Sequence, residues 1–348
     1  MSTIKVNSIK NTSTDDGGIA IDNSGHVQVD GQQLPTTGAL SNRNLIINGA
    51  HIVWQRQTSV SGGSVLDNFA YATDRFWLYA PSSTSGTVGQ STDAPSGFIY
   101  STHNNLDSSC TIGTNVELLK QGSDAPFVNG ESLTFSFYIK STSARTGVAL
   151  TITTRDNAGG AGSVTRATGV TFDSTTSWTR VEKTFTLSNT IGSNNRCLQI
   201  EFSLAIGDKV TGFQLEKGDK ATPFEHRSYS DELLRCYRYY YKLNQANGAM
   251  FGPAVKYNAT VALGIIEFPV HMRANVTAIE QSGTASHYGV IGATSTATCT
   301  SVPSYGGDAS NKLMNVNFSV SSGTFSTGQA VLFRSRDNDA FLAFSAEL

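Results

Sequence analysis

The sequence predicts an all-β protein, and three observations lead to this prediction. Charged residues make up only 15% of the 348 residues, whereas glycine contributes 33. Polar tracts rich in Gly, Ser and Thr separate short apolar segments, which is typical of many strands joined by turns. Within these segments apolar and polar residues alternate, so that each strand buries one face, as in two antiparallel sheets packed together. We therefore expect a jelly-roll sandwich flanked by smaller β segments.

Residues 1–41 form the first predicted part, an attachment or oligomerisation segment that ends in a linker. Short alternating runs surround "DNSG" (22–25), a good hairpin turn, and "GQQLPTTGALS" (31–41) is the predicted linker. The few aliphatic residues cannot enclose a core, because so little buried apolar area does not offset the ordering entropy. We expect copies of the segment or another protein to complete it; a floppy tail is the alternative. The residues expected to pack there are Ile19, Ile21, Val27 and Val29.

Residues 42–227 form the second predicted part, the jelly roll itself. Its clearest strand is "SLTFSFYIK" (132–140), in which every second residue is apolar. The same pattern predicts strands at 148–154, 181–187 and 198–206. In the last of these, the side chains expected to share the buried face are Leu198, Ile200, Phe202, Leu204 and Ile206.

A Tyr-rich helix is predicted over residues 228–242. Ser228 and Asp231 fit a capping box, and Pro223 ends the preceding strand. Apolar residues at helical spacing form a stripe that can pack on a sheet or on a sister helix while the Tyr hydroxyls stay in water. A Tyr platform for sugar is the alternative function of this stripe. The residues expected to pack are Leu233, Leu234, Tyr237, Tyr240 and Tyr241.

Residues 243–348 form the third predicted part, a smaller β-domain. Alternation predicts strands at 314–320, 330–335 and 340–348, and "RDND" (336–339) is a polar tight turn between the last two.

Several classes of function are disfavoured by composition. A formal net charge of −2 and a pI near 6.3 give no electrostatic footprint for nucleic acid. No run of 18 apolar residues is present, so we expect no membrane insertion, and no secretory signal is visible at the N-terminus, so we expect assembly in a cytoplasm. The four cysteines fit no metal or disulfide spacing and are expected to be small buried side chains: Cys110, Cys197, Cys236 and Cys299.

Enzyme chemistry finds no support in the motifs. The six histidines show no metal-ligand spacing, and neither a GxSxG nor a Walker-type motif occurs. Carboxylates are present without a pattern that pairs them, although a glycosidase can assemble two of them in space. We expect a protein that is not an enzyme and that uses no metal and no cofactor.

An ordered set of segments resembles a phage virion family, the tail-fibre and host-adsorption proteins that carry a carbohydrate-binding-module-like jelly roll. The "STIKVNSIKN" start resembles the attachment ends of fibres from marine and cyanobacterial phages. The set covers most of the chain, and its most specific member is the passage that runs from "QLEKGDKATPFEHRSY" into the Tyr-rich helix. The matching stretches are "NRNLIINGAHIVWQR" (42–56), "YATDRFWLY" (71–79), "ESLTFSFYIKS" (131–141), "TSWTRVEKTFTLS" (176–188), "GFQLEKGDKATPFEHRSYSDELLRCYRYYYK" (212–242) and "FLAFSAEL" (341–348).

The resemblance implies a virion protein, most simply of the tail, that attaches to a host surface polysaccharide without covalent chemistry. It implies a homotrimer, because fibres of this family are usually homotrimers, and it implies that residues 1–40 are held by another virion protein. The chain is short for a fibre and has no long shaft. A head or tail decoration protein without receptor binding is therefore the rival reading, and a polysaccharide depolymerase is a third.

Sugar contacts are expected on loops of the C-terminal β-domain, which is distal if the N-terminus is the anchor. Aromatic residues of the second part could stack on sugar rings instead, but Trp54, Trp77 and Trp178 are expected in the core, and only Tyr79 carries no such expectation. Asp74 and Arg75 are expected to form a buried or half-buried ion pair. The predicted glycan contacts are His287, Tyr288, Tyr305, Asp308, Arg336, Asp337 and Asn338.

Overall fold

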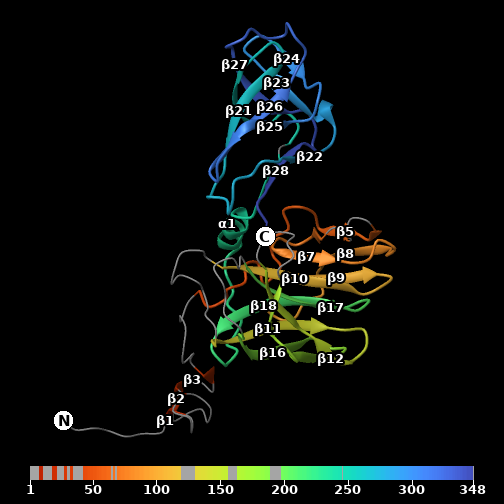
Figure 1. Cartoon of the computed structure of the whole chain (residues 1–348), viewed down its shortest axis with the longest axis vertical. Coiled ribbons are helices and arrows are strands. Elements are labelled where there is room, and N and C mark those ends of the chain that lie inside the picture. The colour runs from red at the N-terminus through yellow and green to blue at the C-terminus, as the bar shows by residue number, and fades with distance from the viewer. Residues whose placement is uncertain are drawn as a thin grey trace, which may run out of the picture. The chain divides into compact units, whose positions relative to one another are not determined.

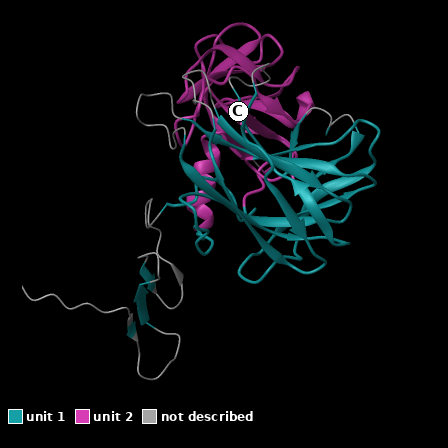
Figure 2. Cartoon of the chain, turned by 60° about the horizontal axis from the view of Figure 1, so that its bottom comes forward, with its two compact units in different colours: residues 1–52, 59–72, 76–227 teal, residues 53–58, 73–75, 228–348 magenta. Residues whose placement is uncertain are grey.

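The structure is a computed structural model, and it divides the chain into two compact units (Figure 2). Unit 1 comprises residues 1–52, 59–72 and 76–227, and unit 2 comprises residues 53–58, 73–75 and 228–348. Two short segments of the predicted jelly roll therefore group with the C-terminal residues. The described residues are 8–10, 18–21, 27–29, 32–33, 42–63, 66, 69–118, 130–155, 163–188, 197–244 and 246–347.

A four-stranded antiparallel sheet forms near the N-terminus from β1 (Ser8–Lys10), β2 (Gly18–Ile21), β3 (Val27–Val29) and β4 (Gln32–Gln33) (Figure 1). Its register aligns Ile9 with Ile19, and Ile21 with Val27, so that these side chains share one face. All four are exposed, between 38% and 63%. The predicted alternation is confirmed for these residues, whereas the "DNSG" turn, most of the linker and the Val29 side chain lie outside what the structure describes.

The rest of unit 1 is a sandwich of two six-stranded antiparallel sheets, as the alternation predicts (Figure 1). The first sheet has the order β14 (Val164–Ala167), β13 (Thr151–Arg155), β17 (Cys197–Leu204), β10 (Cys110–Glu117), β7 (Phe76–Tyr79) and β6 (Ala70–Tyr71). The second sheet has the order β16 (Thr179–Thr186), β11 (Ser132–Lys140), β18 (Lys209–Lys217), β9 (Ser101–Leu106), β8 (Gly86–Ser91) and β5 (Ser59–Ser61). A separate two-stranded sheet pairs β12 (Arg145–Ala149) with β15 (Thr171–Ser174).

Aromatic rings fill the space between the two six-stranded sheets. Phe137 of β11 stacks on Phe202 of β17 at 4.7 Å between ring centroids, and on Phe213 of β18 at 5.5 Å. Phe172 meets Phe137 edge-on at 5.1 Å. Phe202 comes from the first sheet, Phe137 and Phe213 from the second, and Phe172 from β15, so strands with one apolar face each enclose a single core.

Two strand predictions in unit 1 need correction. Residues 148–154 are not one strand, since β12 and β13 meet there with Leu150 between them and belong to different sheets. Ile206 does not share the buried face of 198–206, because β17 ends at Leu204 and Ile206 is 51% exposed. The alternation of apolar and polar residues continues beyond the end of β17, where the chain is no longer part of the sheet.

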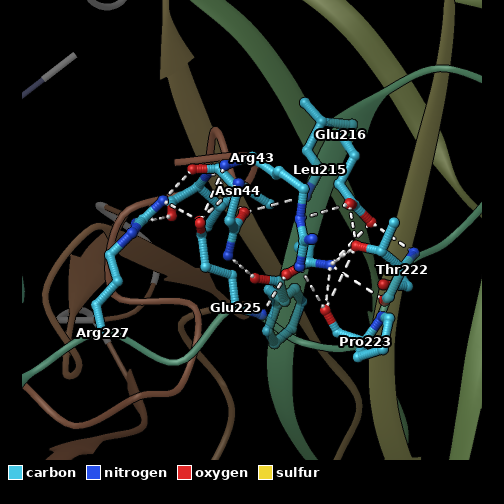
Figure 3. Close-up of polar contacts among 12 residues, drawn as sticks. Arg43, Asn44, Leu215, Glu216, Thr222, Pro223, Glu225 and Arg227 are labelled. Carbon is cyan, nitrogen blue, oxygen red and sulfur yellow. Dashed lines mark hydrogen bonds and ion pairs between the residues drawn. The ribbon is translucent and has the colours of Figure 1, made fainter. Parts of the chain in front are cut away.

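The passage 212–227, which carries the most specific part of the resemblance, comprises most of β18 and the segment that follows it, and polar contacts link it to residues 43–44 (Figure 3). The Asn44 side chain donates to the carbonyl of Phe213 at 2.9 Å and accepts from the backbone of Leu215 at 3.1 Å. The Glu225 carboxylate accepts from the backbone of Asn44 at 3.0 Å and from Arg227 at 3.1 Å. Residues distant in sequence thus satisfy one another's polar groups, which makes this passage a part of the scaffold.

Unit 2 contains one helix, two sheets and a 3₁₀ turn, η3 (Ala285–His287), among its described residues. The large sheet has the order β24 (Thr296–Thr298), β23 (Tyr288–Ile291), β27 (Ala330–Ser335), β20 (Met250–Lys256), β21 (Val261–Glu267), β26 (Leu313–Ser319) and β25 (Ser304–Ala309). The small sheet has the order β19 (Tyr240–Asn244), β28 (Phe341–Ser345) and β22 (Glu280–Gln281). Residues 336–339 join β27 to β28 and so connect the two sheets instead of closing a hairpin.

The Tyr-rich helix α1 spans Tyr229–Tyr237 and is shorter than predicted. Its start is as expected, because the Ser228 hydroxyl accepts from the backbone of Asp231 at 3.2 Å. Its predicted end is wrong, since Tyr240 and Tyr241 lie on β19 and pair with β28. Aromatic residues favour strands, and here a partner strand is available.

The expected packing stripe of this region is therefore split between helix and strand. Tyr240 is 2% exposed, and the Tyr241 ring stacks on Phe344 of β28 at 6.1 Å. Tyr237 meets Tyr241 edge-on at 5.0 Å, Leu233 is half-buried and Leu234 is 50% exposed.

A buried charge cluster fixes residues 55–56 and 74–75 within unit 2. Asp74 and Arg75 are 1% and 3% exposed, as expected. Arg75 pairs with Glu347, and Arg56 reaches Glu347 at 3.4 Å and Asp74 at 4.0 Å, whereas a pair between Asp74 and Arg75 themselves stays a prediction. The guanidinium groups also lie over Tyr rings, Arg75 over Tyr239 at 3.5 Å and Arg56 over Tyr240 at 3.6 Å.

Candidate functional site

One face of the first six-stranded sheet of unit 1 points away from the sandwich core. Leu78, Ile112 and Phe202 of this sheet point into the core and are at most 3% exposed. The residues that alternate with them point outward, and most are polar. We call this the outer sheet face; its members include Tyr71, Trp77, Tyr79, Thr111, Gly113, Asn115, Glu117, Thr151, Thr153, Arg155, Gln199, Glu201 and Ser203.

An aromatic group occupies the edge of the outer sheet face at β6 and β7. Phe69 stacks on Tyr79 at 5.2 Å between centroids and meets Trp77 edge-on at 5.4 Å. Phe69 is 49% exposed and Tyr79 is half-buried, so ring surface remains open to solvent. Phe69 also has a φ of 57°, which is uncommon for a bulky residue, and such backbone strain concentrates at binding sites.

Gly113 of β10 allows the Trp77 ring to lie against the sheet. The two residues are register partners, and a Cβ atom on Gly113 would lie only 2.1 Å from Trp77 Cζ2. Trp77 is consequently 5% exposed, so its predicted burial is confirmed, although it packs on the outer sheet face and not between the sheets. A larger residue in place of Gly113 would displace the ring.

Amide and carboxylate groups follow the aromatic edge toward β17 and β13. Asn115, Gln199 and Thr153 form one row across β10, β17 and β13, and each is at most 9% exposed. The Gln199 amide donates to Glu201, which is half-buried. Burial raises the pKa of the Glu201 carboxyl above its usual value, against the Gln199 hydrogen bond and the positive charge of Arg155, which lower it.

The order of these groups suits a ligand that is flat on one side and rich in hydroxyls. Register places Trp77, Gly113 and Glu201 in one row, so that roughly 10 Å separates the aromatic edge from the carboxylate at the usual strand spacing. Aromatic rings can stack on the apolar face of a sugar, while amides and carboxylates exchange hydrogen bonds with hydroxyl groups.

The contacts predicted in unit 2 fall into two groups. The backbone of Arg336 donates to the His287 carbonyl at 2.8 Å, and Asp337 and Asn338 follow directly, so these four lie together. Tyr305 and Asp308 lie on β25, at the opposite edge of the seven-stranded sheet from β24 and β23. The sequence placed all of them in loops and could not show that the sheet separates them.

Tyr288 is a correction to the predicted contacts. Its side chain is fully buried, its hydroxyl accepts from Ser282 at 2.9 Å and donates to the carbonyl of Phe341 at 2.8 Å. The residue begins β23 and is part of the unit 2 core, where its polar tip is satisfied. Glycan contact by the remaining six residues stays a prediction.

Two other tryptophans are only half-buried. Trp178 donates its ring N–H to Asp93 at 3.0 Å, and Asp93 also binds Lys140 at 3.0 Å and Lys209 at 3.1 Å. This contact links the start of β16 to β11 and β18, which is a structural role. Trp178 was expected in the core, but it is only half-buried. Trp54 is half-buried as well.

All four cysteine side chains are buried, as predicted. Within the described part of the chain, no group of three or more His, Cys, Asp or Glu side chains could hold a metal ion. No helix in that same part has the length and apolar character needed to cross a membrane.

A known protein family matches the part of the chain that contains the outer sheet face. Residues 67–204 match the Carbohydrate binding domain family. This range contains β6, β7, β10, β13 and β17, and therefore every member of the outer sheet face. The family match covers less than half of the chain. A search of curated proteins found no match to this chain.

Several solved structures are similar to part of this chain at low sequence identity. The xylan-binding domain CBM22-1 of Paenibacillus barcinonensis Xyn10C is 10% identical, with 53% of this chain and all of that chain covered at a TM-score of 0.31. TmCBM61, solved with β-1,4-galactotriose, is 13% identical over 51% of this chain and all of its own, at 0.26. The enzymatically active domain of bacteriophage CBA120 tailspike protein 4 is 13% identical over 50% of this chain and 21% of its own, at 0.29.

Reasoning from the sequence missed most of the outer sheet face. The available signal was the identity of the polar residues that alternate with the apolar ones in three strands, "CTIGTNVE", "TITTR" and "CLQIEFSL". The amides and carboxylates at outward positions of the first and third of these strands differ from the Thr and Ser that fill other outward positions. Which strands are neighbours is set only by the fold.

Proposed function

We propose that this chain binds a glycan on the outer sheet face of unit 1. Phe69 and Tyr79 stack on a sugar ring, and Asn115, Gln199 and Glu201 exchange hydrogen bonds with its hydroxyl groups. The observation that carries the proposal is the row from Trp77 through Gly113 to Glu201, which joins an aromatic edge to buried polar groups. The match of residues 67–204 to a carbohydrate-binding family supports it, and that family is a non-catalytic binding domain.

The proposal is tested by affinity electrophoresis of the full chain in gels that contain neutral polysaccharides: xylan, mixed-linkage β-glucan, galactan and mannan. We expect retardation by at least one of them, and Phe69→Ala to weaken it about tenfold, which corresponds to about 1.4 kcal/mol. Tyr257→Ala is the matched control, because Tyr257 is 63% exposed and lies in unit 2. Absence of binding to every polymer would contradict the function. Equal retardation of Phe69→Ala and the natural chain would contradict the placement of the site.

We further propose that glycan binding serves attachment of a phage virion to its host, with the chain as a homotrimeric fibre or spike. Support comes from the ordered sequence segments that resemble tail-fibre proteins and from the exposed apolar face of β1–β3. Three copies would convert weak sugar contacts into useful avidity. In this proposal residues 1–40 also meet another virion protein, and the protein resides in the virion, in the tail.

The attachment role is tested with whole cells. Purified full chain should bind the host surface and compete with phage adsorption, and removal of surface polysaccharide should abolish both effects. A decoration protein without receptor binding would leave adsorption unchanged, and a depolymerase would release reducing sugar from the polysaccharide. Either result would replace the attachment proposal.

A further inference from the structure

An open pocket of about 560 Å³ lies at the edge of the sandwich in unit 1. Its lining comes from β14, β15, β16 and the turn between β14 and β15, so it is distinct from the outer sheet face. The volume falls within the usual range for sites that bind small molecules. Its lining includes Arg166, Lys183, Thr168, Thr171, Thr186 and Ser188.

The pocket has an uneven charge. Arg166 and Lys183 both line it, and no Asp or Glu occurs among the described lining residues. The remaining polar lining consists of Thr and Ser, whose hydroxyls can bond to a ligand but carry no charge. Both cations would attract an anionic ligand.

Arg166 is held rigidly. The residue is 2% exposed, its Nε donates to the Thr154 hydroxyl at 2.7 Å, and its Nη1 reaches the Ser188 carbonyl at 3.4 Å. Ser188 in turn bonds to the Arg166 carbonyl through its backbone N–H at 2.8 Å and through its hydroxyl at 2.7 Å. A guanidinium fixed in this way is pre-organised to receive a planar or tetrahedral oxyanion.

Lys183 occupies a position where the strand pattern predicts an apolar residue. It alternates with Val181 and Phe185, which are buried, and its register partner on β11 is Phe135, which is fully buried. Lys183 therefore points along the inner side of edge strand β16. An inward charge on an edge strand can also serve to block pairing with another chain. Blocking strand pairing would require neither a pocket nor a second cation. Here Lys183 lines a pocket together with Arg166 of the other sheet, which favours a binding role.

We infer that this pocket binds an acidic sugar residue, through an oxyanion held between Arg166 and Lys183. This inference rests on the proposed function and deepens it, because it names the class of glycan: one that carries a carboxylate, as in a uronic acid, or a sulfate ester. The outer sheet face would bind neutral parts of the same chain. Recognition of the charged residue would then set specificity.

The test measures affinity of the full chain for polygalacturonate, for a sulfated galactan and for the matching neutral galactan. We expect tighter binding to at least one acidic polymer than to the neutral one, and an affinity that falls with added salt. The polymer that binds more tightly identifies the oxyanion as carboxylate or sulfate. Lys183→Gln should reduce acidic binding about tenfold and leave neutral binding unchanged. Lys220→Gln is the control, because Lys220 is exposed and its substitution removes the same charge away from the pocket.

Arg166→Lys gives a second variant that keeps the charge but loses the planar group, and its unfolding midpoint shows whether it remains folded. If acidic and neutral polymers bind equally, or if Lys183→Gln binds acidic polymers as tightly as Lys220→Gln does, the inference is overturned. Binding that is lost in Phe69→Ala but not in Lys183→Gln would overturn the inference and leave the proposed function standing. Absence of binding to every polymer would overturn both.

Discussion

Trp77 lies across Gly113, its register partner between β7 and β10. The contact places an indole ring beside Phe69 and at the start of a row of polar groups. Aromatic surface and hydrogen-bonding groups are thereby brought onto one rigid sheet, where their relative positions do not depend on loop conformation.

Gly113→Ala is expected to weaken glycan binding about tenfold, because the added Cβ would lie 2.1 Å from Trp77 Cζ2 and must displace the ring. Gly252→Ala is the matched control, since the nearest atom to a Cβ there is Ile266 Cδ1 at 3.8 Å. Affinity electrophoresis measures both. Unchanged binding by Gly113→Ala, with the variant folded, would show that the position of Trp77 does not matter for recognition.

His51 should make unit 1 sensitive to acid. It is fully buried, lies 2.9 Å from the Thr102 hydroxyl through Nδ1 and stacks on Phe213 at 5.0 Å. Burial lowers the pKa of His51 from 6.5 to about 3. Between these values the unfolded chain binds a proton that the folded chain does not. This group therefore gives its full stability above pH 6.5, and loses it as pH falls toward 3, by about 1.4 kcal/mol per pH unit.

Urea unfolding between pH 3 and pH 8 measures this dependence. His51→Asn should lower stability at neutral pH and reduce the slope, and asparagine tolerates the positive φ of 51° at this position. Thr102→Val should also lower stability but keep the slope, because the histidine remains. An unaltered slope in His51→Asn would assign the acid sensitivity to other groups.

Glu347→Gln is expected to destabilise unit 2 by about 3 kcal/mol, because it removes the carboxylate that pairs with the buried Arg75 and the partly buried Arg56. Arg75 and Glu347 have side chains only 3% and 9% exposed, so solvent cannot replace the lost charge. Glu267→Gln, at the exposed last position of β21, should change stability by less than about 1 kcal/mol. Denaturant unfolding of both variants gives the comparison, and equal stabilities would show that the cluster contributes nothing.

Ile19→Asp and Ile21→Asp should reduce the number of chains in the assembly, since both side chains lie on the exposed apolar face of β1–β3. Ala20→Asp on the other face of β2 is the control. Sedimentation equilibrium measures the mass, and we expect three copies of the 37.1 kDa chain in the natural protein. A single chain in solution would contradict the trimer proposal.

Strict alternation allowed much of the sandwich to be predicted from sequence. The strand 132–140 was predicted correctly because its apolar residues occur at every second position. All four of them are fully buried: Leu133, Phe135, Phe137 and Ile139. The helix was predicted too long because Tyr240 fits both a helical stripe and a strand, and only its pairing with β28 decides between them.

The candidate site could be predicted less well, for a physical reason. Gly113 and Glu201 lie far apart in sequence and become neighbours only when β10 pairs with β17. Glycan contacts were predicted on the loops of unit 2 because polar and aromatic residues lie close together in sequence there. The fold then buried Tyr288 and separated Tyr305 from Arg336.

Hydroxyl-radical footprinting of the full chain, with and without a polysaccharide that it retains, tests the location of the glycan most directly. If the outer sheet face binds the sugar, oxidation of Phe69 and Tyr79 falls in the complex while Tyr257 and Tyr305 keep their free rates. Unchanged oxidation of Phe69 and Tyr79, together with protection of His287 or Tyr305, would contradict that assignment and move the binding surface to unit 2.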